Sequence, residues 1–247
     1  NILDLNDLCF FAKKTNGVYD RDYLWKVNAL IQNQPNLKRL SLNGINYDLH
    51  TKKLALQSMF TNLQCSQLTH LTIDYIILEN KNTLCLSELI MKSQTLKELT
   101  MYFVVLDKDL TKKSFSSIFE ALAVNSTITS LLLDFKANKS SIKESEILLY
   151  LSRVLLLNNS IQSIQMPRTP LKQHYFNKHH HLMNSLVVNT ELRSLEMKRV
   201  VNMVLLKRIV EKLKVNEDLR RLNVTPMINT GRYVAVRKCA HYLNTTK

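Results

Sequence analysis

The chain has little of what flexible linkers, phosphate loops and membrane spans are made from. Of its 247 residues only 3 are Gly and 4 are Pro, which argues against a flexible linker, a phosphate-cradling glycine loop and a proline-rich ligand segment. No stretch approaches the roughly 18 to 20 unbroken apolar residues of a membrane helix. The strongest candidate, residues 147–157, is interrupted by Ser152 and Arg153. We therefore expect no membrane insertion.

Cysteines are few and scattered. Cys9, Cys65, Cys85 and Cys239 include no CxxC pair, which argues against a disulfide framework and a cysteine-based zinc site. Such usage is typical of a reducing compartment, so we expect a cytoplasmic, intracellular protein.

Acidic residues are outnumbered. Asp and Glu total 20 against 34 Lys and Arg, a formal net charge of +14, which would attract nucleic acid. The excess is mostly lysine spread along the chain, together with many Asn and Ile residues. A genome's base composition can impose that bias, so we keep nucleic acid as an alternative partner and not the expected one.

What the chain does contain is repetition. An apolar residue, two polar residues, Leu or Ile, one further residue and a third apolar residue recur seven times. Successive first positions lie 31, 28, 32, 33, 31 and 27 residues apart. Repetition on this scale predicts a solenoid, in which each unit packs against its neighbours. The triads are Leu37/Leu40/Leu42, Leu68/Leu71/Ile73, Leu96/Leu99/Met101, Ile128/Leu131/Leu133, Ile161/Ile164/Met166, Leu192/Leu195/Met197 and Leu219/Leu222/Val224.

Each repeat predicts one helix followed by one short strand. In residues 141–167, Ser141 to Glu144 fits a capping box at a helix start. We expect Asn158 to end the helix in the left-handed conformation that Asn tolerates. The spacing of two between Ile164 and Met166 places both on one face of a strand. Apolar residues at helical spacing lie between these signals: Ile147, Leu148, Leu151, Val154 and Leu155.

The same register recurs around Asn125, Asn158, Asn189 and Asn216. Apolar residues lie seven, three and one positions before each Asn and three positions after it. In two earlier repeats Cys65 and Ser93 take the place of the Asn. TPR and ankyrin arrays have similar periods but need two helices per repeat, and only one helical face fits between the strands here.

The pattern of helix, Asn and apolar-x-x-Leu-x-Leu resembles the leucine-rich repeat, in a divergent form of its ribonuclease-inhibitor-like class. The resemblance implies an α/β fold: a right-handed solenoid with parallel strands on the concave face and helices on the convex face. We expect residues 1–247 to form a single array of about seven full repeats. We also expect a fragment cut at both ends, because Leu3 and Leu5 fit the last two triad positions of an earlier repeat.

One position departs from the family. Eight residues after the first triad position the family usually carries Asn or Cys, which binds backbone groups of the next turn. The turns here therefore need water or other partners for those groups. The residues at this position are Ile45, Ile76, Val104, Lys136, Thr169, Val200 and Met227.

A partner surface is expected on the strands, because residues between the triad positions point to the opposite face. This face is basic at both ends, with carboxylates and a tyrosine between, a mixture that suits protein better than a phosphate track. The candidate partner-binding residues are Lys38, Arg39, Asn43, His70, Asp74, Lys97, Glu98, Tyr102, Asp134, Arg193, Glu196, Lys198, Arg220 and Arg221.

Catalytic and metal-binding patterns are missing from the sequence. It contains no HExxH, GxSxG or P-loop motif and no recognisable Ser/His/Asp set. His174 lies apart from His179–His181, and consecutive helix residues diverge by about 100°, which suits no shared ion. We expect no catalytic residue, no metal and no cofactor, and hence no enzyme.

The leading hypothesis is a non-enzymatic scaffold that binds other proteins, or a structural subunit of a larger intracellular assembly such as a cytoskeletal or ciliary one. One alternative is a GTPase-activating protein of the leucine-rich-repeat type, with Arg39, Arg193 or Arg220 reaching the nucleotide. The other is a basic solenoid that binds nucleic acid.

Overall fold

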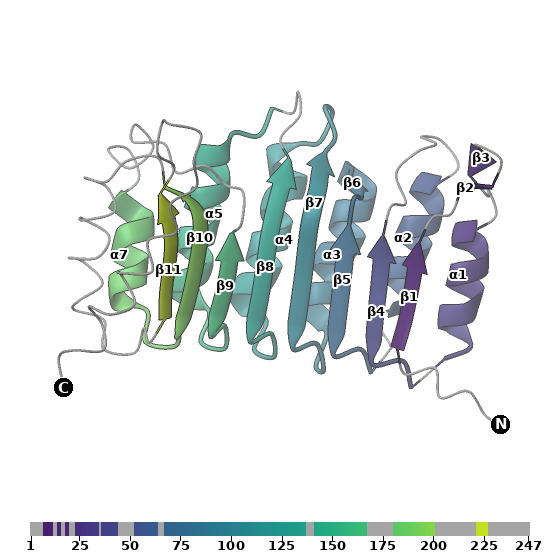
Figure 1. Cartoon of the computed structure of the whole chain (residues 1–247), viewed down its shortest axis with the longest axis horizontal. Coiled ribbons are helices and arrows are strands. Elements are labelled where there is room, and N and C mark those ends of the chain that lie inside the picture. The colour runs from purple at the N-terminus through teal and green to yellow at the C-terminus, as the bar shows by residue number, and fades with distance from the viewer. Residues whose placement is uncertain are drawn as a thin grey trace. The chain divides into compact units, whose positions relative to one another are not determined.

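Helices and parallel strands alternate along the chain (Figure 1). The computed structural model describes residues 7–11, 14–15, 18–19, 23–34, 36–43, 52–63, 67–136, 141–166, 180–200 and 221–226. The chain divides into two compact units. Unit 1 comprises residues 1–128 and 135–142, and unit 2 comprises residues 129–134 and 143–247.

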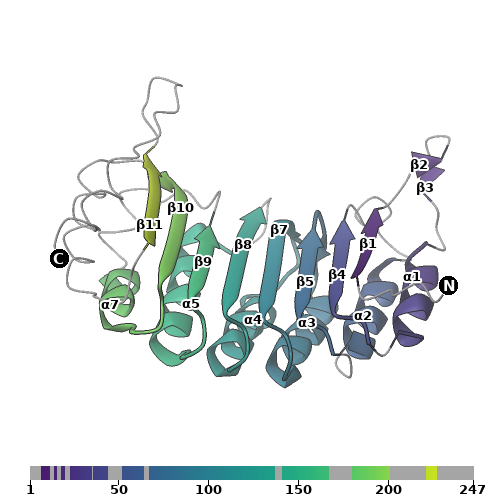
Figure 2. The same ribbon diagram turned by 60° about the horizontal axis from the view of Figure 1, so that its bottom comes forward.

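Unit 1 is a parallel sheet with helices along one face. Its strands lie in the order β1-β4-β5-β7, with β6 paired to β7, and β2 and β3 form a separate antiparallel pair. Helices α2, α3 and α4 lie on the same side of these strands in both views (Figures 1 and 2). The elements are β1 (Asp7–Phe11), β2 (Lys14–Thr15), β3 (Val18–Tyr19), α1 (Tyr23–Gln32), β4 (Arg39–Asn43), α2 (Lys52–Leu63), β5 (His70–Asp74), β6 (Ile77–Leu78), α3 (Asn80–Lys92), β7 (Glu98–Leu106) and α4 (Lys112–Val124).

Unit 2 repeats the arrangement. Its parallel strands lie in the order β8-β9-β10-β11, and the chain passes from one unit to the other within β8. The elements are β8 (Ser130–Lys136), α5 (Glu144–Leu157), β9 (Ser163–Met166), α7 (His180–Val188), β10 (Ser194–Val200) and β11 (Arg221–Pro226). No helix among the described residues is long and apolar enough to cross a membrane.

The triad residues form the core, as the repeat pattern predicts. All members of the first five triads, together with Leu192 and Leu195, are at most 2% exposed. In unit 1 the middle positions Leu40, Leu71 and Leu99 lie opposite one another in register, and so do the third positions. Each such side chain contributes roughly 1.5–3 kcal/mol by its burial. The inside and outside faces of these strands are therefore confirmed.

The first strand starts later than expected. Leu8 and Phe10 of β1 lie opposite Leu40 and Leu42. Leu3 and Leu5 were predicted for these two positions of the first strand, and both lie outside the described residues. Leu8 precedes Leu40 by 32 residues, a spacing that matches the other repeats, whereas Leu3 precedes it by 37. Leu8 and Phe10, and not Leu3 and Leu5, therefore take the second and third triad positions of the first strand.

The asparagines that end the helices are not left-handed. Asn125 has φ −69° and ψ 129°, and Asn158 has φ −88° and ψ 129°, both extended. In this conformation the side-chain Oδ1 reaches forward to the next turn. Asn125 Oδ1 accepts hydrogen bonds from the N–H groups of Thr127 (2.9 Å) and Ile128 (2.8 Å). The predicted C-terminal geometry was therefore wrong, although the residue does end the helix.

The same asparagine side chains also connect successive repeats. Asn125 Nδ2 donates to the carbonyls of Ile90 (2.7 Å) and Ser93 (3.1 Å), and Asn189 Nδ2 donates to Leu155 O at 2.7 Å. A buried carbonyl without a partner is costly, so each amide stabilises the end of the preceding helix. The asparagine amides thus link successive repeats by hydrogen bonds at the helix-to-strand turns.

The N-cap of helix α5 lies two residues after the predicted one, Ser141. Lys143 is the N-cap, and its N–H donates to Glu146 Oε2 at 2.8 Å. Ser141 Oγ instead donates to the carbonyl of Leu110 at 3.4 Å. The predicted box from Ser141 to Glu144 was wrong because a second carboxylate, Glu146, stands three residues after Lys143 and reaches back.

Candidate protein-binding surface

The face of the unit 1 sheet opposite the buried triads carries three rows of side chains. Each row joins residues that lie directly opposite one another on β4, β5 and β7. Arg39 and Glu98 are exposed, and the members of β5 are half-buried. The rows are Arg39, His70 and Glu98; Ser41, Thr72 and Thr100; and Asp74 and Tyr102, which are in register with the backbone of Asn43.

Polar contacts orient the first row. His70 Nε2 lies 3.3 Å from Glu98 Oε1, and His70 Nδ1 lies 2.8 Å from Thr69 Oγ1. The Thr69 hydroxyl donates to the carbonyl of Lys38 at 2.9 Å. The imidazole is therefore held between a hydroxyl and a carboxylate, which fixes its orientation on the surface.

Charge is distributed unevenly along these strands. Lys38 and Lys97 immediately precede β4 and β7 and are exposed, so that with Arg39 they make the amino ends of the strands basic. Asp74 and Tyr102 lie four residues further along, which at about 3.3 Å per residue is about 13 Å away. The surface thus has a basic end and an end with a carboxylate and aromatic rings.

Two aromatic residues follow the last row in an uncommon backbone conformation. Tyr75 has φ 54° and Phe103 has φ 51°, in the left-handed region that costs a non-glycine residue roughly 1–2 kcal/mol. Their rings stack with centroids 4.6 Å apart and an interplanar angle of 12°. Tyr102 meets Phe103 edge-on at 4.8 Å. We call Tyr75, Tyr102 and Phe103 the aromatic cluster.

The left-handed residues reverse the direction in which the following side chains point. After the buried Ile73 and Met101, the next buried residues are Ile76 and Val104, three positions on instead of two. The sheet hydrogen bonds continue, because Tyr75 N donates to Tyr102 O (3.1 Å) and Val105 N to Ile76 O (2.8 Å). At these two repeats, apolar core residues and backbone pairing occupy the position where a leucine-rich repeat usually carries Asn or Cys.

The next repeat, which contains β8, shows the ordinary alternative. Phe135 occupies the sequence position that corresponds to Phe103, but it packs against α4, with its ring 5.2 Å from that of Phe115. Lys136, at the next position, is exposed. Regular alternation therefore turns Phe135 inward, whereas the left-handed backbone keeps Tyr75 42% exposed.

The other predicted surface residues have mixed outcomes. Arg193 is exposed and Glu196 is half-buried on β10. Asp134 is only 2% exposed, so its expected place on an open surface is wrong. A buried carboxylate is stable only with protein partners, and Asp134 has an interaction inside the protein. For Asn43, Lys198 and Arg221 only the backbone is described, and Arg220 lies outside the described residues.

Sequence reasoning missed the outward rings of Tyr75 and Phe103. The sequence does carry a signal for them. Ile76 and Val104 are apolar and follow the triad residues Ile73 and Met101 by three positions, a spacing that does not fit a regular strand. Sequence reasoning also treated the apolar position before each helix-ending Asn like the core positions. Val124, Leu157 and Val188 are instead 66%, 66% and 60% exposed.

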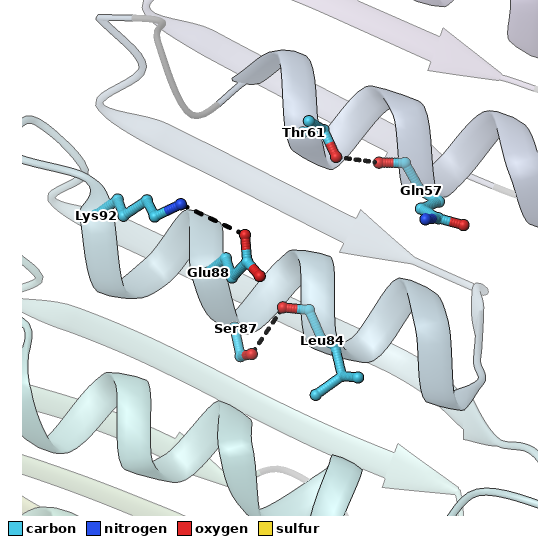
Figure 3. Close-up of polar contacts among 6 residues, drawn as sticks. All are labelled: Gln57, Thr61, Leu84, Ser87, Glu88 and Lys92. Atoms are coloured by element: carbon cyan, nitrogen blue, oxygen red, sulfur yellow. Dashed lines mark hydrogen bonds and ion pairs between the residues drawn. The ribbon is translucent and has the colours of Figure 1, made fainter.

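The helix side carries mainly local contacts. On α3 Lys92 Nζ lies 3.4 Å from Glu88 Oε2, and the Ser87 hydroxyl donates to Leu84 O at 2.7 Å (Figure 3). On α2 the Thr61 hydroxyl donates to Gln57 O at 3.0 Å. Within the described part of the chain, no three His, Cys, Asp or Glu residues lie close enough to hold a metal ion. His181 is exposed on α7, and His174 and His179 lie outside that part.

Comparisons with known proteins assign no family. No family model matches the chain, and no curated protein matches it. Among solved structures, it is similar to leiomodin-1 actin-binding site 2, with a TM-score of 0.46 and 14% identity, over 65% of this chain and 88% of that chain. A likeness this weak supports no argument about function, so the surface is interpreted from its own residues.

Proposed function

We propose that the chain is a divergent leucine-rich-repeat solenoid that serves as a non-enzymatic, protein-binding scaffold in a larger intracellular assembly. In this proposal the solenoid is right-handed, the strands line its concave face and the helices form its convex face. The observation that carries the proposal is the strand face of unit 1, where charged, hydroxyl and aromatic side chains stand in register above a fully buried triad layer.

The composition of this face favours protein as the partner. Arg and Tyr are enriched in protein interfaces, and carboxylates repel a phosphate backbone. Glu98 lies in the same row as Arg39, and Asp74 lies in the same row as Tyr102. Side chains on paired strands are also largely preordered, so binding loses little conformational entropy.

The test compares two variants that change the same charges on opposite sides of unit 1. The strand-face variant carries Lys38→Ala, Arg39→Ala and Glu98→Ala. The helix-face variant carries Lys81→Ala, Lys113→Ala and Glu88→Ala. All six side chains are exposed, and each variant loses two positive charges and one negative charge.

Each variant and the unmodified chain are used to capture proteins from the organism's own cells at physiological salt with nuclease present. We expect a stoichiometric protein partner whose recovery falls at least about tenfold with the strand-face variant and stays unchanged with the helix-face variant. Equal recovery by both variants, or loss of all partners on nuclease treatment, would contradict the proposal.

A further inference from the structure

We propose that the aromatic cluster, together with Asp74, is an arginine-binding subsite of the partner surface. The proposal rests on the proposed protein-binding function and deepens it, since it names the side chain that the partner inserts. The subsite lies at the carboxyl ends of β5 and β7, where Asp74 is directly opposite Tyr102.

The ring geometry leaves part of one aromatic surface open. Phe103 stacks on Tyr75 with an interplanar angle of 12°, so it covers one face of that ring. Tyr75 nevertheless remains 42% exposed. Tyr102 meets Phe103 edge-on at 4.8 Å, and both residues are half-buried. The most accessible ring of the cluster is therefore that of Tyr75, which stacks on Phe103.

The left-handed backbone holds the Tyr75 ring outward, where it is open to contact. Glycine would suit this left-handed position better than tyrosine, because it adopts positive φ without a steric penalty. The residue at the same sequence position of the preceding repeat is indeed Gly44, which lies outside the described residues. Strained backbone of this kind clusters at binding sites, and here it holds Tyr75 outward where regular alternation would turn it inward, as with Phe135.

The charge beside the rings selects a cation. Asp74 immediately precedes Tyr75 and supplies a carboxylate in the row next to the cluster. The basic residues of the strand face, Lys38 and Arg39, lie about 13 Å away along the strands. That distance exceeds the Debye length of about 8 Å at physiological ionic strength, so the repulsion they exert on a cation at Tyr75 is largely screened.

Arginine fits this arrangement better than lysine. Its planar guanidinium stacks on an aromatic face and is weakly hydrated. Tyr75 offers the face, and the half-buried Asp74, whose Oδ1 is enclosed, places negative charge on the preceding residue. An ammonium group is compact and strongly hydrated, so it would satisfy the carboxylate and use the ring less.

The test uses short peptides as probes. The unmodified chain is titrated with acetyl-Gly-Ser-Arg-Ser-Gly-amide and with matched peptides that carry citrulline, lysine or leucine in the central place. Ring resonances of Tyr75 and Phe103 are followed by NMR. We expect the arginine peptide to bind about three- to tenfold more tightly than the citrulline peptide, which has the same shape without the charge.

Two variants locate the binding. Tyr75→Gly removes the ring while allowing the left-handed backbone, and Asp74→Asn removes the charge; we expect each to lower the arginine peptide's affinity at least threefold. Glu120→Gln is the control, because it removes an exposed carboxylate from helix α4, away from the strand face, and should have no such effect. Folding of each variant is checked by the backbone NMR spectrum.

The outcomes separate this proposal from the proposed function. Equal binding of the leucine peptide would overturn the arginine assignment and make the cluster an apolar anchor. No ring shift with any peptide up to 10 mM, or a partner captured from cells with undiminished recovery by Tyr75→Gly, would overturn the subsite. If Tyr75→Gly recovers the partner undiminished but the strand-face variant loses it, the subsite is refuted and the proposed scaffold function is still supported.

Discussion

At the scale of single residues, Tyr75 and Phe103 show local preference losing to packing. Left-handed backbone costs each residue roughly 1–2 kcal/mol, and an aromatic pair returns about 0.5–1.5 kcal/mol beyond its burial. The remainder is supplied by Ile76 and Val104, which the reversed direction of the chain places in the core at 0% exposure. The strain is therefore tied to the burial of the next residue.

This argument predicts an inverted order of stability at position 75. Tyr75→Gly should be more stable than Tyr75→Ala by about 1 kcal/mol, because both remove the ring but only glycine relieves the left-handed backbone. Urea denaturation of the two variants measures the difference. At Thr72, an outward residue of β5, the order should be the usual one, with glycine less stable than alanine by about 0.5–1 kcal/mol. If the glycine variant were less stable than the alanine variant at both positions, the backbone at Tyr75 would not be strained.

Asn125 provides the second residue-scale prediction. Asn125→Ala should lower the free energy of unfolding by about 3 kcal/mol, because two carbonyls and two backbone N–H groups around the buried amide lose a partner. Asn159→Ala is the matched control: it changes an exposed asparagine and should alter stability by less than about 0.5 kcal/mol. Similar denaturation midpoints for both variants would show that the amide ladder contributes little.

At the scale of elements, two adjacent leucines in β8 test the two faces of a strand. Leu131 is 1% exposed, whereas Leu132 points to the other face and is half-buried. Leu131→Ala should cost about 2–5 kcal/mol, and Leu132→Ala less than about 1 kcal/mol. Both variants delete the same atoms, so equal shifts of the urea midpoint would mean that the assigned faces are wrong.

The sequence predicts the order and type of most elements because their signals are periodic. Triads spaced two and three residues apart specify strands with one buried face, and the apolar positions before each Asn specify helices. Helix ends are less predictable, since several polar residues compete for the same backbone groups. Glu146 captures the Lys143 N–H, and the asparagine side chains prefer the next turn to a left-handed backbone.

The helix ends also show where periodicity misleads. Val124, Leu157 and Val188 recur at one position like core residues, yet each is at least 60% exposed. Leu157→Gln should therefore change the free energy of unfolding by less than about 0.5 kcal/mol. Leu155→Gln, two residues earlier and 3% exposed, should cost several times as much, because an amide would be buried without partners. Thermal or urea denaturation distinguishes the two.

At the scale of the whole molecule, the candidate surface is only partly predictable from sequence. Alternation along a strand places Arg39, His70, Glu98 and Tyr102 on the outer face correctly. It fails for Asp134, which alternation places on the outer face but which is only 2% exposed. It also fails for Tyr75 and Phe103, because their left-handed backbone interrupts the regular alternation of the strand.

The net charge of +14 belongs to the whole chain, and its effect on nucleic acid can be separated from partner binding. If the charge acts diffusely, affinity for duplex DNA and for RNA should show no sequence preference. It should be weaker than about 1 µM at 150 mM salt, as for non-specific binding. Affinity measured at salt concentrations from 50 to 200 mM tests this.

The charge-matched variants make that comparison quantitative. Because the strand-face and helix-face variants each lower the net charge by one, they should weaken nucleic-acid binding equally. Only the strand-face variant should lose the captured protein partner. If the strand-face variant instead abolished a nanomolar, sequence-selective interaction at 150 mM salt while the helix-face variant preserved it, the outer strand face would be a nucleic-acid site. The basic ends of the strands would then have been assigned to the wrong class of partner.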